Sequence, residues 1–280
     1  MNPANDMQSL LRFKSTDLTQ IIYEPKTKSK SLVFGRRLYQ FQFNQQRYWL
    51  KAQVSDSSPE HVASFGREIE LYQLFSQAST QNSITLPFQV IKQSHLSIQQ
   101  ESIDRLLILP NAEPWFVQPA SNLSLAQVRQ VLWQALDVVE RLSLHGWIHA
   151  DLKQEHFVNW QGQCRLIDFE QALPLEFDQL DALTATPRYM APELFHGQAK
   201  SLHSDIYALG IIFLEWLTSQ RLEAKNYEDW AYLHCQRLKL DLPLQYQGFT
   251  QLLQHMLMKQ KNDRLVDFYR LKSDLVAEFA

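Results

Sequence analysis

The chain has 280 residues, which is enough for one large domain or for two lobes that share a cleft. With 45% hydrophobic and 20% charged residues, its composition is that of an ordinary globular protein and excludes a disordered or fibrous chain. The formal net charge is −3, and the one short basic run is Lys26-Thr27-Lys28-Ser29-Lys30. This charge pattern argues against a nucleic-acid partner, because neutralising phosphates requires clustered Lys and Arg.

The cysteines and the apolar segments bear on the compartment. Cys164 and Cys235 are far apart and have no His or Cys at ligand spacing, which argues against disulfide and zinc sites. The N-terminus lacks the charged and apolar segments of a signal peptide. The longest apolar run, 206–217, contains Glu215 and is too short to span a bilayer. We therefore expect a cytoplasmic protein with no membrane partner.

The first part of the chain has the pattern of strands. Residues 39–43 alternate apolar with polar side chains, and 47–51 continue after Asn44-Gln45-Gln46, which predicts a hairpin. A helical pattern follows over about 65–75. Residues 105–109 are typical of a buried strand, which Pro110 ends.

From about residue 121 the patterns are helical. Ser124 and Gln127 have the spacing of a capping box, and the apolar residues after them recur at helical intervals up to Leu142. Residues 205–217 are apolar almost all round, so we expect this helix in the middle of a helical lobe.

These patterns predict an α+β, bilobal fold with a small strand-rich N-lobe and a helical C-lobe. Ligands favour the cleft between two such lobes. The expected boundaries are an N-terminal extension at 1–19, the N-lobe at 20–112 and the C-lobe at 113–280.

Two carboxylates give the strongest chemical signal. Asp151 lies in the loop after the helix of 124–144, and Asp168 follows the apolar stretch 164–167. In phosphoryl transfer, one carboxylate can orient the attacking hydroxyl while another holds the magnesium that neutralises the phosphates. Magnesium needs only a few carboxylate oxygens besides the substrate phosphates, so no larger ligand set is expected.

In its motifs the chain resembles the eukaryotic-type protein kinases. Each motif alone is weak, since a charged residue is most often simply solvated, but all of them occur in the family's order over roughly 30–275. The matching elements are His149-Ala150-Asp151-Leu152-Lys153, Asp168-Phe169, Ala191-Pro192-Glu193, Asp205-Ile206-Tyr207-Ala208-Leu209-Gly210, Lys51 at the end of a strand, Glu68 in the next helix, and Arg264.

The resemblance implies a role for each matching residue. As catalytic residues, Asp151 acts on the acceptor hydroxyl and Lys153 steadies the transferring phosphate. For the cofactors ATP and Mg, Lys51 binds the phosphates with Glu68 as its partner, and Asp168 holds the metal. Gly35 matches the last glycine of the family's phosphate-covering loop.

The resemblance also predicts two contacts in the C-lobe. Thr186, in the segment that resembles the docking site for a protein substrate, is placed to bond Asp151 and Lys153. Glu193 and Arg264 are expected to form a buried ion pair.

Four departures from the family pattern bear on mechanism. His156 stands where the family has a metal-binding asparagine, and it either binds metal or only hydrogen-bonds within its loop. Glu170 replaces a glycine and either adds a metal oxygen or, as we expect, points to solvent. The phosphate-covering loop has few glycines, with Lys30 and Leu32 at the two earlier positions. Ala150 replaces the arginine that binds a phosphorylated activation loop, so activity is expected not to depend on that modification.

The favoured function is an ATP-dependent kinase that phosphorylates serine or threonine hydroxyls of protein substrates. One alternative is a catalytically silent pseudokinase that binds nucleotide or protein, which the four departures favour. The other is a small-molecule or sugar kinase, which His156 favours and the intact Ala191-Pro192-Glu193 segment disfavours.

Overall fold

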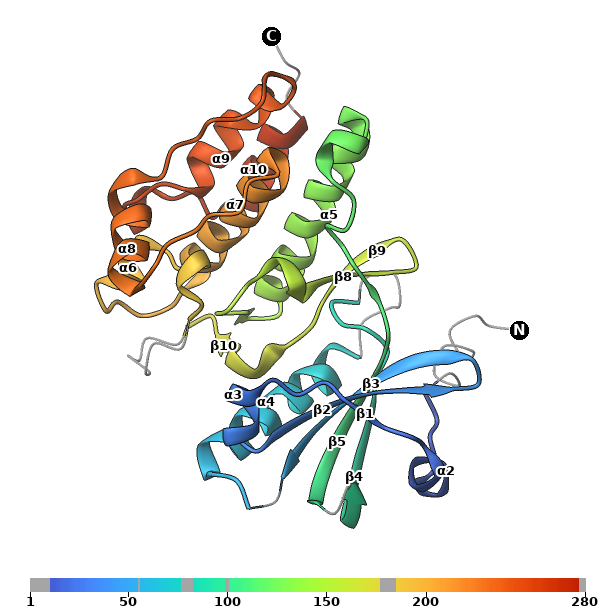
Figure 1. Cartoon of the computed structure of the whole chain (residues 1–280). Helices are drawn as coiled ribbons and strands as arrows, with labels where there is room; N and C mark the ends of the chain where they lie inside the picture. Colours follow the sequence, from blue (N-terminus) through green and yellow to red (C-terminus); the bar gives the residue numbers. More distant parts are fainter. Residues whose placement is uncertain (1–10, 55, 77–82, 99–100, 177–184, 277–280) are drawn as a thin grey trace. The chain divides into compact units, whose positions relative to one another are not determined.

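The computed structural model describes residues 11–276 apart from 55, 77–82, 99–100 and 177–184 (Figure 1). The chain divides into two compact units. The first unit comprises Met1–Ala112 and Ile167–Glu170, and the second comprises Glu113–Leu166 and Gln171–Ala280. The first is rich in strands and the second is mainly helical, so the α+β prediction is confirmed. Among the described residues, none of the helices combines the length and the apolar character needed to cross a membrane.

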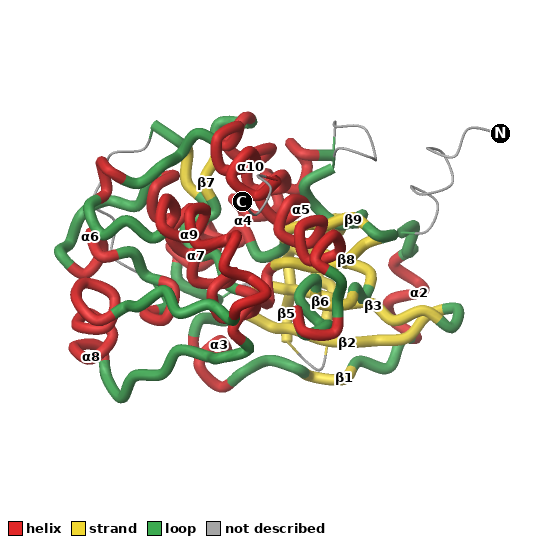
Figure 2. Tube along the Cα trace, turned by 90° about the horizontal axis from the view of Figure 1, so that it is seen from above, coloured by secondary structure: helices red, strands yellow, loops and turns green. Residues whose placement is uncertain are grey.

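A five-stranded antiparallel sheet forms the centre of the first unit, with strand order β1-β2-β3-β5-β4. Figure 2 labels β1, β2, β3 and β5 of this sheet. The predicted hairpin is confirmed: Phe43 pairs with Gln46, and Asn44 and Gln45 turn the chain with positive φ angles of 47° and 65°. The strands are β1 Glu24–Pro25, β2 Arg36–Phe43, β3 Gln46–Val54, β4 Gln89–Ile98 and β5 Glu101–Pro110.

The two faces of this sheet have different partners. One face joins the main apolar cluster of the unit, which includes Tyr39, Leu50 and Ile108 from the strands. The segment before β1, with helix α2 (Ser15–Gln20), adds Phe13 and Leu18 to the same cluster. Residues 11–19, within the expected N-terminal extension, therefore contribute to the core of the first unit.

Helix α4 (Pro59–Phe75) packs against the opposite face and begins earlier than the sequence pattern predicts. Ser58 is its N-cap and accepts a hydrogen bond from the backbone of His61, while Pro59 occupies the first turn, where no N–H is needed. Its buried residues include Phe65 and Glu68, and they set the position of the site described below.

The segment before β2, which the resemblance matches to the phosphate-covering loop, contains a short helix, α3 (Ser29–Val33). Phe34 follows it and stacks on His61 with ring centroids 4.6 Å apart. Gly35 then turns the chain with φ 70°, and a β-carbon there would overlap the Ser57 hydroxyl. Gly35 thus allows a close backbone approach within the protein.

Helices make up most of the second unit. The capping box at the start of α5 is confirmed: the Gln127 side chain accepts from the Ser124 backbone at 2.9 Å, and the Ser124 hydroxyl accepts from the Gln127 N–H. The helices are α5 Leu125–Leu144, α6 Pro192–Phe195, α7 Leu202–Thr218, α8 Tyr227–Tyr232, α9 Thr250–Met256 and α10 Phe268–Val276. The strands are β6 Glu113–Pro114, β7 Trp147–Ile148, β8 Phe157–Trp160, β9 Gln163–Leu166 and β10 Leu173–Pro174.

Helix α7 lies inside the second unit, as its all-round apolar sequence predicts, and residues 204–217 are all buried. The predicted ion pair between Glu193 of α6 and Arg264 is also confirmed, at 2.7 Å with both side chains almost fully buried. Both features belong to the framework of the second unit, which contains the loop of residues 149–153.

Candidate functional site

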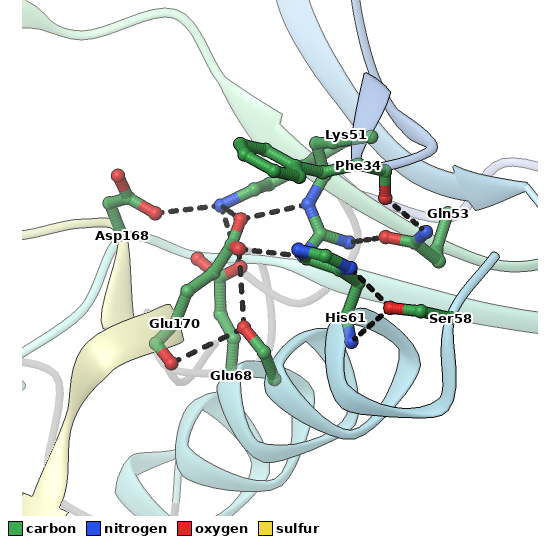
Figure 3. A network of polar contacts seen from close by, with 10 residues as sticks. Phe34, Lys51, Gln53, Ser58, His61, Glu68, Asp168 and Glu170 are labelled. Carbon is green, nitrogen blue, oxygen red and sulfur yellow. Dashed lines mark hydrogen bonds and ion pairs between the residues drawn. The ribbon is translucent and has the colours of Figure 1, made fainter. Parts of the chain in front are cut away.

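Lys51 of β3 lies at the centre of a polar network in the first unit (Figure 3). Its ammonium is 2.7 Å from Glu68 Oε2, 2.8 Å from Asp168 Oδ1 and 2.6 Å from Glu170 Oε1. The predicted pair between Lys51 and Glu68 is therefore confirmed as a contact. Burial alone would lower the pKa of Lys51, but the three carboxylates raise it well above its usual value.

Glu68 reaches Lys51 from helix α4, and its side chain is only 1% exposed. Burial raises the pKa of this carboxyl to about 7, against the lowering effect of the Lys51 ammonium. Removing Lys51 would leave the buried Glu68 carboxylate without this ion pair, so the lysine holds Glu68 in place.

The side chain of Glu170 turns inward, so the expectation that it points to solvent is wrong. Besides Lys51 it contacts Arg36 of β2, which donates from Nε at 2.9 Å and from a terminal nitrogen at 2.6 Å. The Ser64 hydroxyl donates a longer bond of 3.3 Å to the same carboxylate. Burial acts to raise the pKa of Glu170, but Lys51 and Arg36 bring it below its usual value.

Packing of Phe169 positions the two acidic residues beside it. Its ring is fully buried and makes edge contacts with Tyr72 and Phe75 of α4, at centroid distances of 5.5 and 5.7 Å. Asp168 itself has φ 68°, a left-handed conformation that is costly for a residue other than glycine. Because Phe169 anchors the segment, Asp168 and Glu170 both reach Lys51.

The carboxylates of Glu68, Asp168 and Glu170 offer oxygen atoms that all lie within 4.8 Å of one another. Hard cations such as magnesium favour carboxylate oxygens, so the donor set fits a divalent ion. Asp168 is the most accessible of the three, with its side chain 40% exposed. In the part of the chain that the structure describes, this is the one such group, and His156 is not part of it.

In the second unit, Asp205 at the start of α7 holds the loop that contains Asp151. Its carboxylate accepts hydrogen bonds from the backbone N–H groups of His149, at 2.6 Å, and Ala150, at 2.9 Å. Ala150 has φ 64°, so these bonds stabilise a left-handed turn directly before Asp151. Burial raises the pKa of Asp205 to about 7, although both backbone donors act to lower it.

Asp151 and Lys153 lie together, with the ammonium 2.7 Å from Asp151 Oδ2. Thr186 donates from its hydroxyl to Asp151 Oδ1 at 3.2 Å and from its backbone N–H at 3.3 Å. The predicted bond between Thr186 and Asp151 is thus confirmed. A carboxylate and an ammonium beside a threonine hydroxyl can bind a second hydroxyl group and a phosphate.

The ring of His156 is buried and stacks on that of His149, with centroids 5.2 Å apart. This packing favours a role inside the loop over the alternative of a metal ligand. Arg188, in the segment after Thr186, donates to the Leu222 carbonyl at 2.7 Å and lies 3.6 Å from Glu215. Thr184 lies outside the described residues.

A sequence model of the protein kinase domain matches residues 44–273. The chain belongs to the protein kinase family. Members of this family generally use ATP with a divalent metal ion, in keeping with the carboxylate donors around Lys51.

Three curated relatives match shorter stretches of this chain. It is 36% identical over 110 residues to "Cyclin-dependent kinase-like 4" of Mus musculus, which is 38% of this chain and 32% of that protein. It is 29% identical over 109 residues to "Probable serine/threonine-protein kinase PknB" of Lactococcus lactis, a match that covers 38% of this chain and 17% of that protein. It is 33% identical over 103 residues to "Serine/threonine-protein kinase Nek9" of Mus musculus, a match that covers 35% of this chain and 10% of that protein. The matches thus span at most 32% of these relatives' own length.

Sequence reasoning did not identify two features of the kinase domain. Arg36 belongs to none of the sequence motifs, and its partner Glu170 is 134 positions away in the sequence, so only folding brings the two together. The sequence places Asp205 at the start of a helix, and in the structure its carboxylate also accepts hydrogen bonds from the backbone of His149 and Ala150. An aspartate at the start of an apolar helix was the available signal, because burial there requires hydrogen-bonding partners.

Proposed function

We propose that this chain is an ATP-dependent protein kinase that transfers phosphate to serine or threonine hydroxyls of protein substrates. The observation that carries the proposal is the contact of Lys51 with both Glu68 and Asp168, at 2.7 and 2.8 Å. A lysine held between carboxylates from α4 and from the segment after β9 suits the binding of a nucleotide with its metal ion.

For the nucleotide, Lys51 binds the phosphates and Glu68 orients its ammonium. Asp168, with its more exposed carboxylate, holds a divalent cation, and we propose magnesium because the donors are carboxylate oxygens. The cation, when bound, neutralises charge on the phosphates. Gly35 is retained only as a weaker candidate for phosphate contact, since its turn packs against Ser57 and Gln53.

For the acceptor, Asp151 takes up or orients the proton of the attacking hydroxyl. The hydroxyl oxygen bonds to the terminal phosphorus of ATP while the bond from that phosphorus to the ADP oxygen breaks. Lys153 lies 2.7 Å from Asp151 and stabilises the transferring phosphate by its charge. The bonds from Thr186 to Asp151 favour a serine or threonine acceptor, because this threonine already places a hydroxyl beside that carboxylate.

The test compares the wild type with Asp151→Asn and with the exposed control Asp229→Asn. We expect all three to bind ATP with magnesium in calorimetric titrations. Transfer of radiolabelled phosphate to a serine- and threonine-containing peptide library should fall by at least about 100-fold in Asp151→Asn alone. Equal transfer by Asp151→Asn and the wild type would contradict the assignment.

Glu170 favours a second candidate, a silent pseudokinase, because it occupies Lys51 with an additional negative charge. The same two assays separate the candidates. Nucleotide binding without transfer to any peptide, under conditions where the protein is folded, would support the pseudokinase.

A further inference from the structure

Lys51 has as many ionic partners as it has N–H groups to offer. An ammonium carries three donors, and Glu68, Asp168 and Glu170 each place an oxygen within 2.6–2.8 Å of it. A nucleotide phosphate can reach the Lys51 ammonium only if one of these carboxylates withdraws. Glu170 makes the shortest of the three contacts.

Arg36 provides Glu170 with a second cation. Its side chain is 8% exposed, it donates to both carboxylate oxygens of Glu170, and it stacks over the Phe65 ring at 4.4 Å. Gln53 accepts a further hydrogen bond from the guanidinium and donates to the Phe34 carbonyl at 2.9 Å. Arg36 is therefore held from several sides and can keep Glu170 paired when Lys51 is taken by another anion.

The charge balance supports competition at Lys51. Three carboxylates face two cations in this network, so an approaching phosphate meets an excess of negative charge. Glu68 is 1% exposed and is paired with Lys51, so its withdrawal would strand a buried charge. Asp168 is needed for the cation in the proposed function. Glu170 has a second cationic partner in Arg36, which contacts both of its carboxylate oxygens.

We propose that Glu170 occupies the place of a nucleotide phosphate on Lys51 and moves its interaction onto Arg36 when the nucleotide binds. This inference rests on the proposed function and names a regulation of the same site. Glu170 acts as an internal competitor that lowers the affinity for ATP, and Arg36 is the positioning residue that limits this loss. The exchange involves ion pairs only, and no covalent bond changes.

The experiment measures the Kd of ATP, with and without magnesium, by calorimetry for the wild type and three variants of the full chain. Glu170→Gln keeps the side-chain size and should tighten binding roughly tenfold in both conditions, since the competing charge is gone. Glu170→Gly should do the same and serves as a second variant if the first does not fold. The matched control Glu70→Gln, exposed on the same helix as Glu68, should bind like the wild type.

A double-mutant cycle tests the part assigned to Arg36. Arg36→Met should weaken ATP binding several-fold in the wild type, because Glu170 then has Lys51 as its remaining cation among the contacts described above. In the Glu170→Gln background the same substitution should change the Kd by less than about twofold. Arg37→Met, on the same strand and paired with Glu101, is the control. Melting curves establish that each variant is folded.

Several results would overturn the inference. Weaker magnesium-dependent binding in Glu170→Gln, with metal-free binding unchanged, would make Glu170 a metal ligand. Equal weakening by Arg36→Met in both backgrounds would make Arg36 a direct phosphate ligand. An unchanged Kd in both Glu170 variants would exclude competition while leaving the proposed function intact. Absence of ATP binding in every variant, including Glu170→Gln, would contradict the proposed function and this inference together.

Discussion

The guanidinium of Arg264 donates two parallel hydrogen bonds to the carboxylate of Glu193, at 2.7 and 2.8 Å. Further donors of Arg264 reach the carbonyls of Met258 and His203, at 2.8–3.0 Å. The pair is therefore satisfied on both sides, and it ties the start of α6 to the chain between α9 and α10. A charge pair of this kind is costly to break from one side only.

Arg264→Ala should destabilise the second unit by about 3–5 kcal/mol, because Glu193 would keep a buried charge without its partner. Thermal melting followed by circular dichroism measures this as a lower Tm. The control is Arg270→Ala, which removes an exposed arginine from the same part of the chain and should leave the Tm unchanged. Equal melting curves for Arg264→Ala and the wild type would refute the role assigned to the pair.

Asp205 should make the stability of the fold depend on pH. Its pKa rises from 3.8 to about 7 on folding, so the folded state binds a proton more tightly than the unfolded state. The stabilisation is fully present below pH 3.8 and is lost as the pH rises through about 7. This pKa difference corresponds to a change of about 4 kcal/mol in the free energy of unfolding across that pH range.

The Asp205→Asn variant has no ionisable group at this position, so its Tm should depend less on pH than that of the wild type. Between pH 5 and pH 8, the Tm of the wild type relative to that of the variant should therefore fall as the pH rises, as measured by melting curves in matched buffers. The control Asp241→Asn, at an exposed position, should follow the wild-type profile. A constant gap across this range would mean that the Asp205 carboxyl does not titrate there.

Lys51→Met should lower phosphate transfer by at least about 100-fold and weaken ATP binding, since no cation would remain between the three carboxylates to meet the phosphates. Removing the lysine also leaves Glu68 buried without its ionic partner, so the Tm should fall. Calorimetry and a peptide transfer assay give the two activities. Lys92→Met, at an exposed position on β4, is the control. Unimpaired transfer by Lys51→Met would remove the basis of the proposed site.

The sequence predicted those features that depend on local patterns. The hairpin followed from period-two alternation with Asn44 at the turn, and helix α5 followed from its capping box. The contact of Lys51 with Glu68 followed from the family resemblance, because a shared order of motifs implies shared packing.

Features that depend on long-range packing were not predicted. Helix α3 has five residues, too few for a helical period to be recognised, and it is flanked by the stacking of Phe34 on His61. The inward turn of Glu170 depends on Arg36, which lies on β2 far away in sequence. A lone glutamate in a loop is most often solvated, so only the position of the arginine in the fold identifies this one.

Activity should not depend on phosphorylation of the activation segment, residues 171–190. Ala150 offers no guanidinium to bind a phosphate, and its backbone N–H is already bonded to Asp205. Arg188, the nearest alternative in sequence, is engaged with the Leu222 carbonyl and Glu215. The hydroxyl residues of this segment are Thr184, Thr186 and Tyr189; Thr186 already bonds Asp151, and Tyr189 is buried. A phosphate on Thr184 would therefore add charge that neither Ala150 nor Arg188 is set to bind.

The measurement is peptide phosphorylation by protein treated with phosphatase and shown by mass spectrometry to carry no phosphate. The rate of the treated protein should equal that of the untreated protein within about twofold, and the Thr184→Ala variant should have the same rate. Neither change removes a residue that is proposed to bind ATP or the acceptor hydroxyl. Asp151→Asn, treated identically, sets the inactive baseline. Loss of most activity after phosphatase treatment, restored when the protein is rephosphorylated, would show that a cation other than the missing arginine binds the phosphate.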